Sequence, residues 1–493
     1  MSDTVKKYLP HSIFIILATA LLAPLGYFSL FFKLPDGVHF IRQSDSLSFV
    51  LNYLYFKASI FEPENFNLVS ENGKAASEFP LFYWITAQCS ILWNQPAAII
   101  RIIHGLCFFS GIFTLFRFLL KENTPFIAAV VAACLMFCST VVLYYSNNYL
   151  PDIAAAGLTI SAVCLTMSNN KKNIIIGIAL FTLASLIKVT YAIYPIAFFI
   201  SFIIKRDIVI STKTKLTLLI VTALIISSWW LHVHYYNHNL NNDYYANRAI
   251  PLWKTSRLEI EATIDLIQNY WKNSYYPEIS RWWFFVLILS TFLFVKKIGR
   301  FLFAYNMLNI LGIVCFVILF FQKFHDHDYY FLICLPGLAG ITLTALPHII
   351  QYKKQKWFQF TVISAMTIVL LSAYLYITPK IEKRWAATDY IQTLHPQMQE
   401  FRQTIDRTDL EKRDNILVVG DSTMNGVLYQ LERKGYAIPI IPKTTKDILT
   451  EKLISDSDWI VLLKKPRTEN PILNEHLEKI QKYPALIHWK KGV

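Results

Sequence analysis

Charged side chains are scarce in this sequence of 493 residues, since Asp, Glu, Lys and Arg make up 16% of it whereas hydrophobic residues make up 54%. The mean hydropathy is +0.38. Such a composition does not fit an ordinary soluble enzyme, and repeated apolar runs of about 18 residues or more predict membrane-spanning helices. The first run, 11 to 32, has no small-residue cleavage site, and we interpret it as a retained span.

Several motifs are also missing. The sequence has no GxxxxGK[ST] loop, which leaves ATP-driven transport without support. The broken, repeated halves of secondary transporters are not evident. The seven cysteines all fall in apolar segments, without a disulfide framework or metal-binding spacing. The net charge of +14 does not indicate nucleic-acid binding, because Lys and Arg concentrate in short loops between apolar runs, as in the positive-inside pattern of membrane proteins.

The apolar runs and their flanking charges predict about eleven transmembrane helices. The segment 79 to 93 is short for a span, and we interpret it as an aromatic-rich helix lying on the outer surface. With that choice every basic loop faces the cytoplasm, the N-terminus lies inside and the C-terminus lies outside. The predicted spans lie near residues 11 to 32, 97 to 118, 126 to 145, 151 to 168, 173 to 188, 190 to 204, 215 to 232, 281 to 295, 300 to 321, 328 to 347 and 358 to 377.

Two predicted outer loops, 33 to 96 and 233 to 280, are long enough to need structure of their own. In the second loop, the segment 256 to 271 begins with a capping-box pattern, Ser256 followed by Glu259, and continues with apolar residues at helical spacing. It therefore predicts a helix over the outer mouth of the bundle.

After residue 378 the composition becomes that of a soluble domain. The strand-like strings NILVVG, AIPII, DWIVLL and ALIHW alternate with helix-like strings, which predicts a small parallel α/β sheet. The string GDSTMNG, 420 to 426, resembles the first block of SGNH esterases, with Ser422 as candidate nucleophile. No D-x-x-H or G-x-N-D string accompanies it, and such a turn after a strand commonly starts a helix. The expected domains are a transmembrane domain, 1 to 378, and an extracytoplasmic α/β domain, 379 to 493.

A cluster of polar residues follows the first span, in the string VHFIRQSDSLSF. Asp45 is either an exposed acid leading a short helix, 45 to 56, where the helix dipole favours negative charge, or a carboxylate that removes a proton from an attacking hydroxyl. Arg42 is close enough along the chain to pair with this carboxylate or to orient it. The other polar members of the cluster are His39 and Gln43.

Further polar positions fall on the same predicted face of the membrane. Asp152 follows Pro151 and fits an ordinary helix start, but its location also suits catalysis. Lys188 either extends to the lipid headgroups or supplies positive charge to an anionic leaving group. Glu78 is either a surface residue or part of a cavity wall.

The string HDHDYY leads a later span and leaves two alternatives open, metal ligation or direct contact with a phosphate and a sugar. The His-x-His spacing is a weak indication of a metal, and tyrosines at this depth also fit an interfacial belt. The residues of the string are His325, Asp326, His327, Asp328, Tyr329 and Tyr330.

Taken together, the strings HFIRQSD, EFPLFYW, YLPD and HDYYFLICLP resemble the GT-C superfamily of membrane glycosyltransferases, especially the branch of aminoarabinose transferases and protein O-mannosyltransferases. In architecture the resemblance covers residues 1 to 378. It implies a polyprenyl-phosphate sugar as donor and inverting transfer to a cell-envelope acceptor, namely a lipid, a glycan or a protein, on the outer face of a bacterial inner membrane. The alternative function is a transporter, flippase or binding protein for lipid-linked sugars.

By position, the resemblance implies that Asp45 is the general base and Asp152 a second catalytic acid. Arg42, Lys188 and His327 would neutralise the departing phosphate, so that no cofactor is required, with a divalent metal as the open alternative. Glu78 stands where the aminoarabinose enzymes carry a basic residue, which puts aminoarabinose as the sugar in doubt. The remaining predicted substrate contacts are His39, Gln43, Glu78, His325, Asp328, Tyr329 and Tyr330.

Overall fold

The structure, a computed structural model, describes residues 3–69, 73–204, 210–239, 249–352, 355–386, 390–393, 395–405, 412, 414–438, 456–462 and 486–488. The chain divides into two compact units. Unit 1 comprises Met1–Phe32, Arg101–His232 and Asn247–Arg384, and unit 2 comprises Lys33–Ile100, Val233–Ala246 and Trp385–Val493. The first predicted outer loop thus groups with the C-terminal residues, while the predicted domain boundary at 378 stays a prediction.

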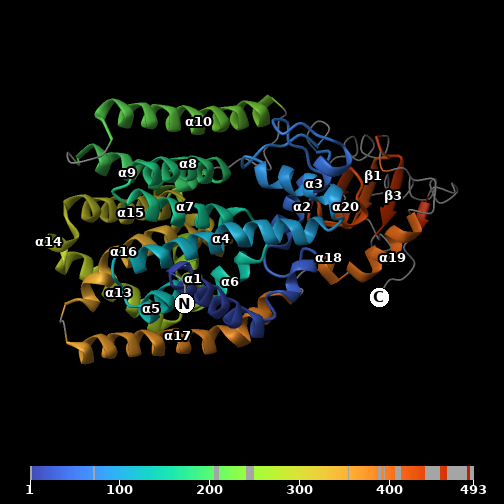
Figure 1. Ribbon diagram of the computed structural model, residues 1–493. Helices are drawn as coiled ribbons and strands as arrows, with labels where there is room; N and C mark the ends of the chain where they lie inside the picture. The colour runs from blue at the N-terminus through green and yellow to red at the C-terminus, as the bar shows by residue number, and fades with distance from the viewer. Residues whose placement is uncertain are drawn as a thin grey trace. The chain divides into compact units, whose positions relative to one another are not determined.

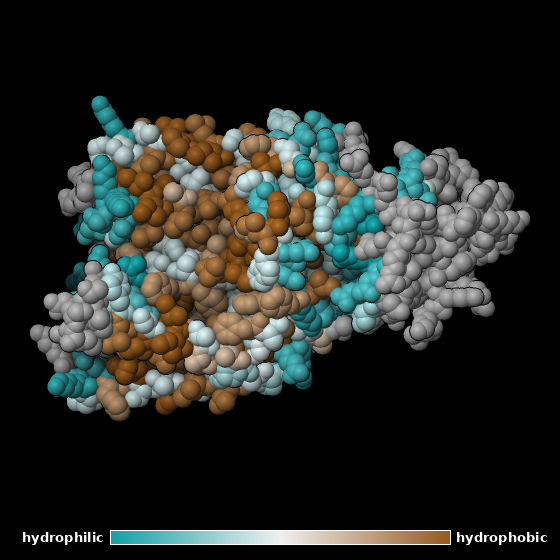
Figure 2. Space-filling model, turned by 45° about the vertical axis from the view of Figure 1, so that its right-hand side comes forward, coloured by the Kyte–Doolittle hydropathy of each residue, from teal (hydrophilic) through white to brown (hydrophobic). Residues whose placement is uncertain are grey.

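Unit 1 is built from apolar helices that run roughly along one another (Figure 1). In Figure 2, hydrophobic residues form a broad area over these helices. Such apolar outward surface suits contact with lipid. The helices, in chain order, are α1 (Asp3–Leu22), α4 (Pro96–Lys121), α5 (Phe126–Leu135), α6 (Thr140–Ser146), α7 (Asp152–Thr166), α8 (Lys171–Ile187), α9 (Ile193–Ile204), α10 (Thr212–Asn239), α11 (Arg257–Leu266), α12 (Lys272–Tyr275), α13 (Glu278–Leu293), α14 (Val295–Ile298), α15 (Arg300–Leu319), α16 (Leu335–Ile350) and α17 (Lys356–Arg384).

Among the described residues, six helices are long and apolar enough to cross a membrane, and a seventh is added if the bent pair α5 and α6 is one span. The pair is bent by 84°. The bend lies at Ser139, whose hydroxyl accepts a hydrogen bond from the Val142 amide and so starts a new helix. Helices α8 and α13 occupy predicted spans but have only 17 and 16 residues. The predicted count of about eleven therefore stays a prediction.

Helix α7 is buried along almost its whole length, and α8 and α16 pack against it. Its close crossing with α4 depends on two glycines, Gly111 and Gly157. A Cβ atom on Gly157 would lie 2.3 Å from the Cys107 carbonyl oxygen, so only glycine allows the two backbones to approach this far. The crossing fixes the position of α7, which begins at Asp152 and is followed by Ser168 and Asn169.

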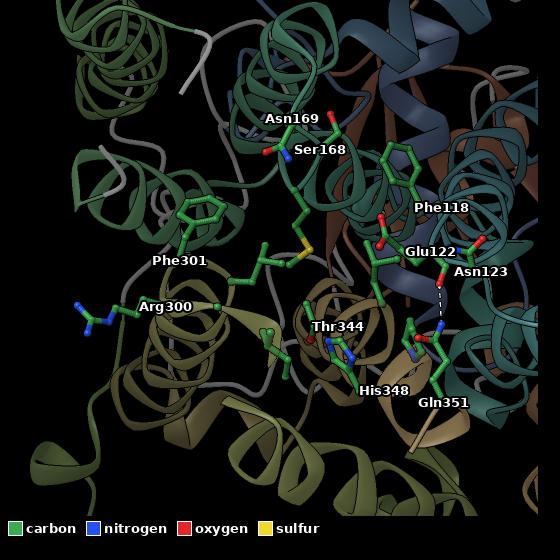
Figure 3. A pocket seen from close by; sticks show the side chains of 16 residues that line it. Phe118, Glu122, Asn123, Ser168, Asn169, Arg300, Phe301, Thr344, His348 and Gln351 are labelled. Atoms are coloured by element: carbon green, nitrogen blue, oxygen red, sulfur yellow. Dashed lines mark hydrogen bonds between the residues drawn. The ribbon is translucent and has the colours of Figure 1, made fainter. Parts of the chain in front are cut away.

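Loops between helices that the sequence predicts to face the cytoplasm, which contain or adjoin basic residues, meet at the C-terminal end of α7, opposite Asp152. Four of them line a pocket of about 570 Å³ (Figure 3), to which they contribute Glu122, Asn169, Arg300 and Gln351 among others. Gln351 Nε2 donates a hydrogen bond to the Glu122 carbonyl oxygen at 3.3 Å. This convergence agrees with a shared cytoplasmic face, although the orientation in the membrane stays a prediction. Of the basic residues used for that prediction, Lys205, Arg206, Lys353 and Lys354 lie outside the described residues.

Unit 2 contains a four-stranded parallel sheet in the order β2-β1-β3-β4. Its strands are β1 (Ile416–Val419), β2 (Gly435–Ile438), β3 (Trp459–Leu462) and β4 (Leu486–His488). Three of them lie within predicted strand-like strings, whereas β2 begins two residues before AIPII and shares only Ala437 and Ile438 with it. The predicted helical segments 445–454 and 471–483 lie outside the described residues. Its helices are α2 (Phe40–Tyr55), α3 (Leu81–Leu92), α18 (Tyr390–Thr393), α19 (His395–Ile405) and α20 (Gly426–Leu431).

The predicted start of the first loop helix is wrong, because α2 begins at Phe40 rather than at Asp45. His39 adopts a left-handed conformation with φ of 59°, and it redirects the chain into the helix. The Gln43 side chain then donates hydrogen bonds to the Asp36 and Val38 carbonyl oxygens at 2.6 and 2.9 Å. Asp45 therefore lies in the second turn of α2 and is not a helix-start acid.

Two other local predictions concern helices outside the predicted spans. The segment 79 to 93 contains α3, which has 12 residues and is too short to span a bilayer. The capping box at the start of α11 is confirmed, since the Ser256 hydroxyl accepts from the Glu259 amide at 3.3 Å and the Glu259 carboxylate accepts from the Ser256 amide at 2.9 Å.

Candidate functional site

Asp45 lies on the buried face of α2, with only 2% of its surface exposed. Its Oδ1 atom accepts a hydrogen bond of 2.7 Å from Asn425 Nδ2, and Asn425 is itself completely buried. Asn425 comes from the turn between β1 and α20. A carboxylate in such a place keeps one orientation, which suits a group that must receive a proton from a defined direction.

Arg42, on the same helix, forms an ion pair with Glu78, which precedes α3. Glu78 also accepts a hydrogen bond from the Tyr83 hydroxyl. The Tyr83 hydroxyl in turn lies 3.2 Å from the Ser46 hydroxyl. Burial, reinforced by the Glu78 carboxylate, raises the pKa of Tyr83 well above its usual value, so its hydroxyl keeps its proton and acts as a donor. The network joins α2 to α3 and holds the Arg42 guanidinium in place.

The structure divides the roles that the sequence suggested for this cluster. Arg42 was expected to orient Asp45, and the structure pairs it with Glu78 while Asn425 bonds to Asp45. The Gln43 amide is buried and bonded to the backbone before α2, and its predicted contact with substrate stays a prediction. His39 is half-buried at the start of the helix.

Unit 1 brings together several other predicted site residues. Asp152 begins α7 and Lys188 follows α8, and Lys188 Nζ lies 3.0 Å from Asp152 Oδ1. The ammonium group also lies 5.7 and 5.8 Å from the ring centroids of Tyr329 and Tyr330, within range of a cation–π interaction. The Tyr191 hydroxyl donates to the Asp152 carbonyl oxygen at 3.1 Å. This group of residues places a positive charge in an aromatic and partly buried setting.

The string HDHDYY contains both exposed and buried residues. Asp328 is completely buried, where it pairs with Arg384 of α17 and accepts a hydrogen bond of 2.7 Å from the Tyr145 hydroxyl. These contacts hold the Asp328 carboxylate inside unit 1, and its predicted contact with substrate stays a prediction. His325 is exposed, with Nδ1 2.7 Å from Asp326 Oδ1.

His327 is half-buried, and its ring centroid lies 5.3 Å from that of Tyr329 and 5.4 Å from that of Tyr330. The ring therefore shares its aromatic neighbours with Lys188. Over the ranges that the structure describes, no three His, Cys, Asp or Glu side chains gather into a group that could hold a metal ion.

Several residues of these networks carried no signal in the sequence. Asn425 is 380 positions from Asp45, and Arg384 is 56 positions from Asp328. Tyr145 and Tyr83 fall within apolar, aromatic strings in which nothing distinguishes them. Only the GDSTMNG string drew attention to the turn that holds Asn425, and there the candidate was Ser422, whose side chain is exposed.

Residues 77–232 match the family described as dolichyl-phosphate-mannose-protein mannosyltransferase. The structure of ArnT from Cupriavidus metallidurans in the apo state matches with a TM-score of 0.59 and 11% sequence identity, over 86% of each chain. The protein has the GT-C fold. The same ArnT bound to undecaprenyl phosphate matches with a TM-score of 0.57 and 11% identity, over 86% of this chain and 85% of that one.

No curated protein sequence matches this chain. The structural match nevertheless covers most of the chain, and it confirms the polytopic helical fold that the resemblance implied. The resemblance to the O-mannosyltransferase type is supported over residues 77–232 by the family match. The matched family region contains Glu78, Asp152 and Lys188, whereas Asp45 and the parallel sheet lie outside it.

Proposed function

We propose that this GT-C protein is an inverting glycosyltransferase that uses a polyprenyl-phosphate sugar. Asp45 accepts the proton of the acceptor hydroxyl as its oxygen attacks the anomeric carbon. The bond from that carbon to the phosphate oxygen breaks, and its electron pair leaves with the polyprenyl phosphate. The acceptor is a lipid, glycan or protein of the cell envelope.

The observation that carries this proposal is the buried, amide-bonded carboxylate of Asp45. General-base catalysis needs a carboxylate held in a fixed direction, and burial removes the water that would otherwise compete for the glycosyl group. Asp45 also occupies the string HFIRQSD, to which the GT-C resemblance assigns the base.

The lipid part of the donor is proposed from two further observations. ArnT, whose fold this chain shares, has been seen with undecaprenyl phosphate. The helices α10 and α17 of this chain are long and apolar, and most of their most apolar stretch is not buried inside the protein. Burying a polyprenyl chain against such surface contributes about 0.8 kcal/mol per CH2 group.

The charges for the leaving phosphate are proposed to come from Lys188 and Arg42, with His327 as a further donor. Each of these two cations already has an acidic partner, Asp152 and Glu78 respectively. The partner holds the long side chain in one place, so less rotamer freedom is lost when a phosphate binds. With side-chain cations in this role, the proposal requires no metal, and transfer should survive an excess of EDTA.

Purified protein tests the proposal with a panel of polyprenyl-phosphate sugars and the acceptor fraction of a bacterial envelope. Asp45→Asn should abolish transfer, by about 10³-fold or more, because an amide cannot accept the proton. Binding of the lipid donor should change little. Asp265→Asn, which alters an exposed carboxylate on α11, is the matched control and should leave transfer unchanged. Transfer at wild-type rate by Asp45→Asn would refute the assignment.

The alternative is a transporter or flippase for lipid-linked sugars, in which the same residues bind the headgroup without breaking a bond. Reconstituted vesicles distinguish the two functions. A transferase releases free polyprenyl phosphate and labelled product, whereas a flippase moves intact donor between leaflets. Movement of intact donor with no release of polyprenyl phosphate would favour the alternative.

We further propose that the protein lies in a bacterial inner membrane with its N-terminus in the cytoplasm and residues 379 to 493 outside. The support is the convergence of the basic loops at one end of α7 and of Asp152, Lys188 and the tyrosine pair at the other.

A further inference from the structure

The turn GDSTMNG, 420 to 426, leads from β1 into α20. The function proposed above uses the Asn425 amide that bonds to Asp45 but does not explain why the turn places it there. Asp421 and Thr423 stabilise it internally. Asp421 Oδ1 accepts from the Thr423 amide at 2.7 Å, and Asp421 Oδ2 accepts from the Val427 amide at 3.0 Å. The Thr423 hydroxyl accepts from the Gly426 amide at 2.9 Å. Two side chains thus satisfy the amides at the start of α20.

Asn425 occupies the N-cap position of α20, where asparagine normally accepts a hydrogen bond from the first turn. Its side chain makes no such bond. Instead its Oδ1 accepts from the Asn67 amide at 3.0 Å, and its Nδ2 donates to Asp45 Oδ1 at 2.7 Å. The Asn425 side chain therefore bonds to residues distant in the sequence and not to its own helix, which indicates a function other than capping.

The contacts also fix which end of the Asn425 amide faces Asp45. A backbone N–H can only donate, so the atom facing the Asn67 amide must be the oxygen. The NH2 group of Asn425 therefore donates the hydrogen bond to the Asp45 carboxylate. Asn67 Nδ2 donates in turn to the Met424 carbonyl oxygen at 2.8 Å, which ties the turn to the first loop from a second direction.

The space around the turn is closely filled. A Cβ atom on Gly426 would lie 2.1 Å from the Thr423 hydroxyl oxygen and 3.1 Å from an Ile391 methyl carbon and a Phe40 ring carbon. Phe40 begins α2, the helix that carries Asp45. The turn is thus packed against α2 and leaves Asn425 little freedom to move.

We propose that Asn425 is the positioning residue for the Asp45 carboxylate, and that the turn 420 to 426 connects the parallel sheet to the catalytic base. A neutral amide donor fixes the plane of the carboxylate and favours its ionised form without adding charge. This inference rests on the proposed function. It gives the C-terminal segment a part in the chemistry, and it replaces Ser422 with Asn425 as the residue of interest in this turn.

Three variants of the turn test the inference by their initial rates between pH 5 and 9. Asn425→Ala removes the donor, and Asn425→Asp keeps the shape but places a carboxylate against Asp45. We expect kcat to fall by about 10- to 100-fold in both, because the base is no longer held in direction. The KM for the lipid donor should stay near its wild-type value. Ser422→Ala, in the same turn but with an exposed side chain, is the matched control and should behave as wild type.

The pH profile separates positioning from general damage to the fold. Loss of the amide donor should move the acid limb of kcat to higher pH, and Asn425→Asp should move it further because a like charge disfavours ionisation. The other charged or titratable groups around this helix are unchanged in these variants. They are Arg42, Glu78 and Tyr83, the turn residue Asp421, His395 against Phe40, and Lys412 and Lys434 over Tyr55 and Phe56. If Asn425→Ala does not fold, the isosteric Asn425→Asp still gives the profile.

The outcomes separate this inference from the proposed function. An inactive Asp45→Asn together with wild-type kcat and pH profile in Asn425→Ala and Asn425→Asp would overturn the positioning role alone. A fully active Asp45→Asn would overturn the proposed function itself. An inactive Asp45→Asn with the lowered kcat and shifted acid limb would support both.

Discussion

Lys188 and Asp152 form an ion pair with 3.0 Å between Nζ and Oδ1, and they bring the end of α8 to the beginning of α7. Both side chains are mostly buried, with 17% and 5% of their surfaces exposed. Tyr329 and Tyr330 lie beside the same ammonium group. The sequence suggested these two residues separately, as a second acid and as a phosphate-binding cation. In the structure they form one ion pair.

The first prediction concerns this ion pair. Lys188→Gln should lower transfer by about 100-fold, because the positive charge offered to the departing phosphate is lost. It should also lower stability by about 3 kcal/mol, since Asp152 then stays buried without its cation. Transfer assays and thermal melting in detergent measure the two effects. The control is Lys172→Gln, an exposed lysine in the first turn of α8. An unaltered rate in Lys188→Gln would remove this residue from the chemistry.

The second prediction concerns Asp328 and Arg384, for which the structure indicates a role in stability. Asp328→Asn leaves the Arg384 guanidinium without its anionic partner inside unit 1 and should cost about 3 to 5 kcal/mol. The double variant with Arg384→Met should recover part of that loss, because no unpaired charge remains. Thermal melting measures this coupling. A melting temperature equal to wild type in Asp328→Asn, with transfer lost, would instead support Asp328 as a substrate contact.

The third prediction is a pH dependence of stability in unit 2. His395 Nε2 donates to the Pro35 carbonyl oxygen at 2.7 Å, and its ring packs against Phe40 and Tyr429. Burial lowers the pKa of His395, and the hydrogen bond to Pro35 only partly offsets this. The nearby charged groups are Asp36, which raises the pKa, and Lys33, which lowers it.

The sign follows from proton linkage. The unfolded state binds a proton near the ordinary histidine pKa of about 6.5, whereas the folded state does so only at lower pH. The contribution of His395 is therefore complete above about pH 6.5 and is lost as the pH falls toward the folded-state pKa. Thermal melting between pH 5 and 8 should show this fall in wild type and a flatter profile in His395→Gln. Equal slopes in the two proteins would contradict the assignment.

The fourth prediction concerns topology. In a cysteine-free background, needed because Cys89 and Cys315 are exposed, an impermeant maleimide added outside should label cysteines introduced at Glu62 and Lys254. Cysteines at Lys121 and Lys171, which lie at the basic end of unit 1, should react only after the membrane is permeabilised. Labelling of the sites at Glu62, Lys121 and Lys171 from outside, but not of the site at Lys254, would mean that the segment with α3 crosses the membrane.

Local features of the fold were predictable where neighbouring residues determine them. The capping box of α11 was visible because Ser256 and Glu259 are three positions apart and bond to each other. The start of α2 was predicted five residues late. There the decisive feature is the left-handed His39 together with Gln43, whose amide bonds to the backbone that precedes the helix.

The sequence by itself determined that the chain is a helical membrane protein, that its candidate catalytic acid is in HFIRQSD, and that its last segment contains parallel strands. Composition, hydrophobic period and charge bias carry this information because each acts through residues close together in the chain. Only the tertiary structure decided the partners of the charges: Glu78 for Arg42, Arg384 for Asp328, and Asn425 for Asp45. Burial made those pairings necessary, because a charge removed from water needs a partner wherever the fold supplies one.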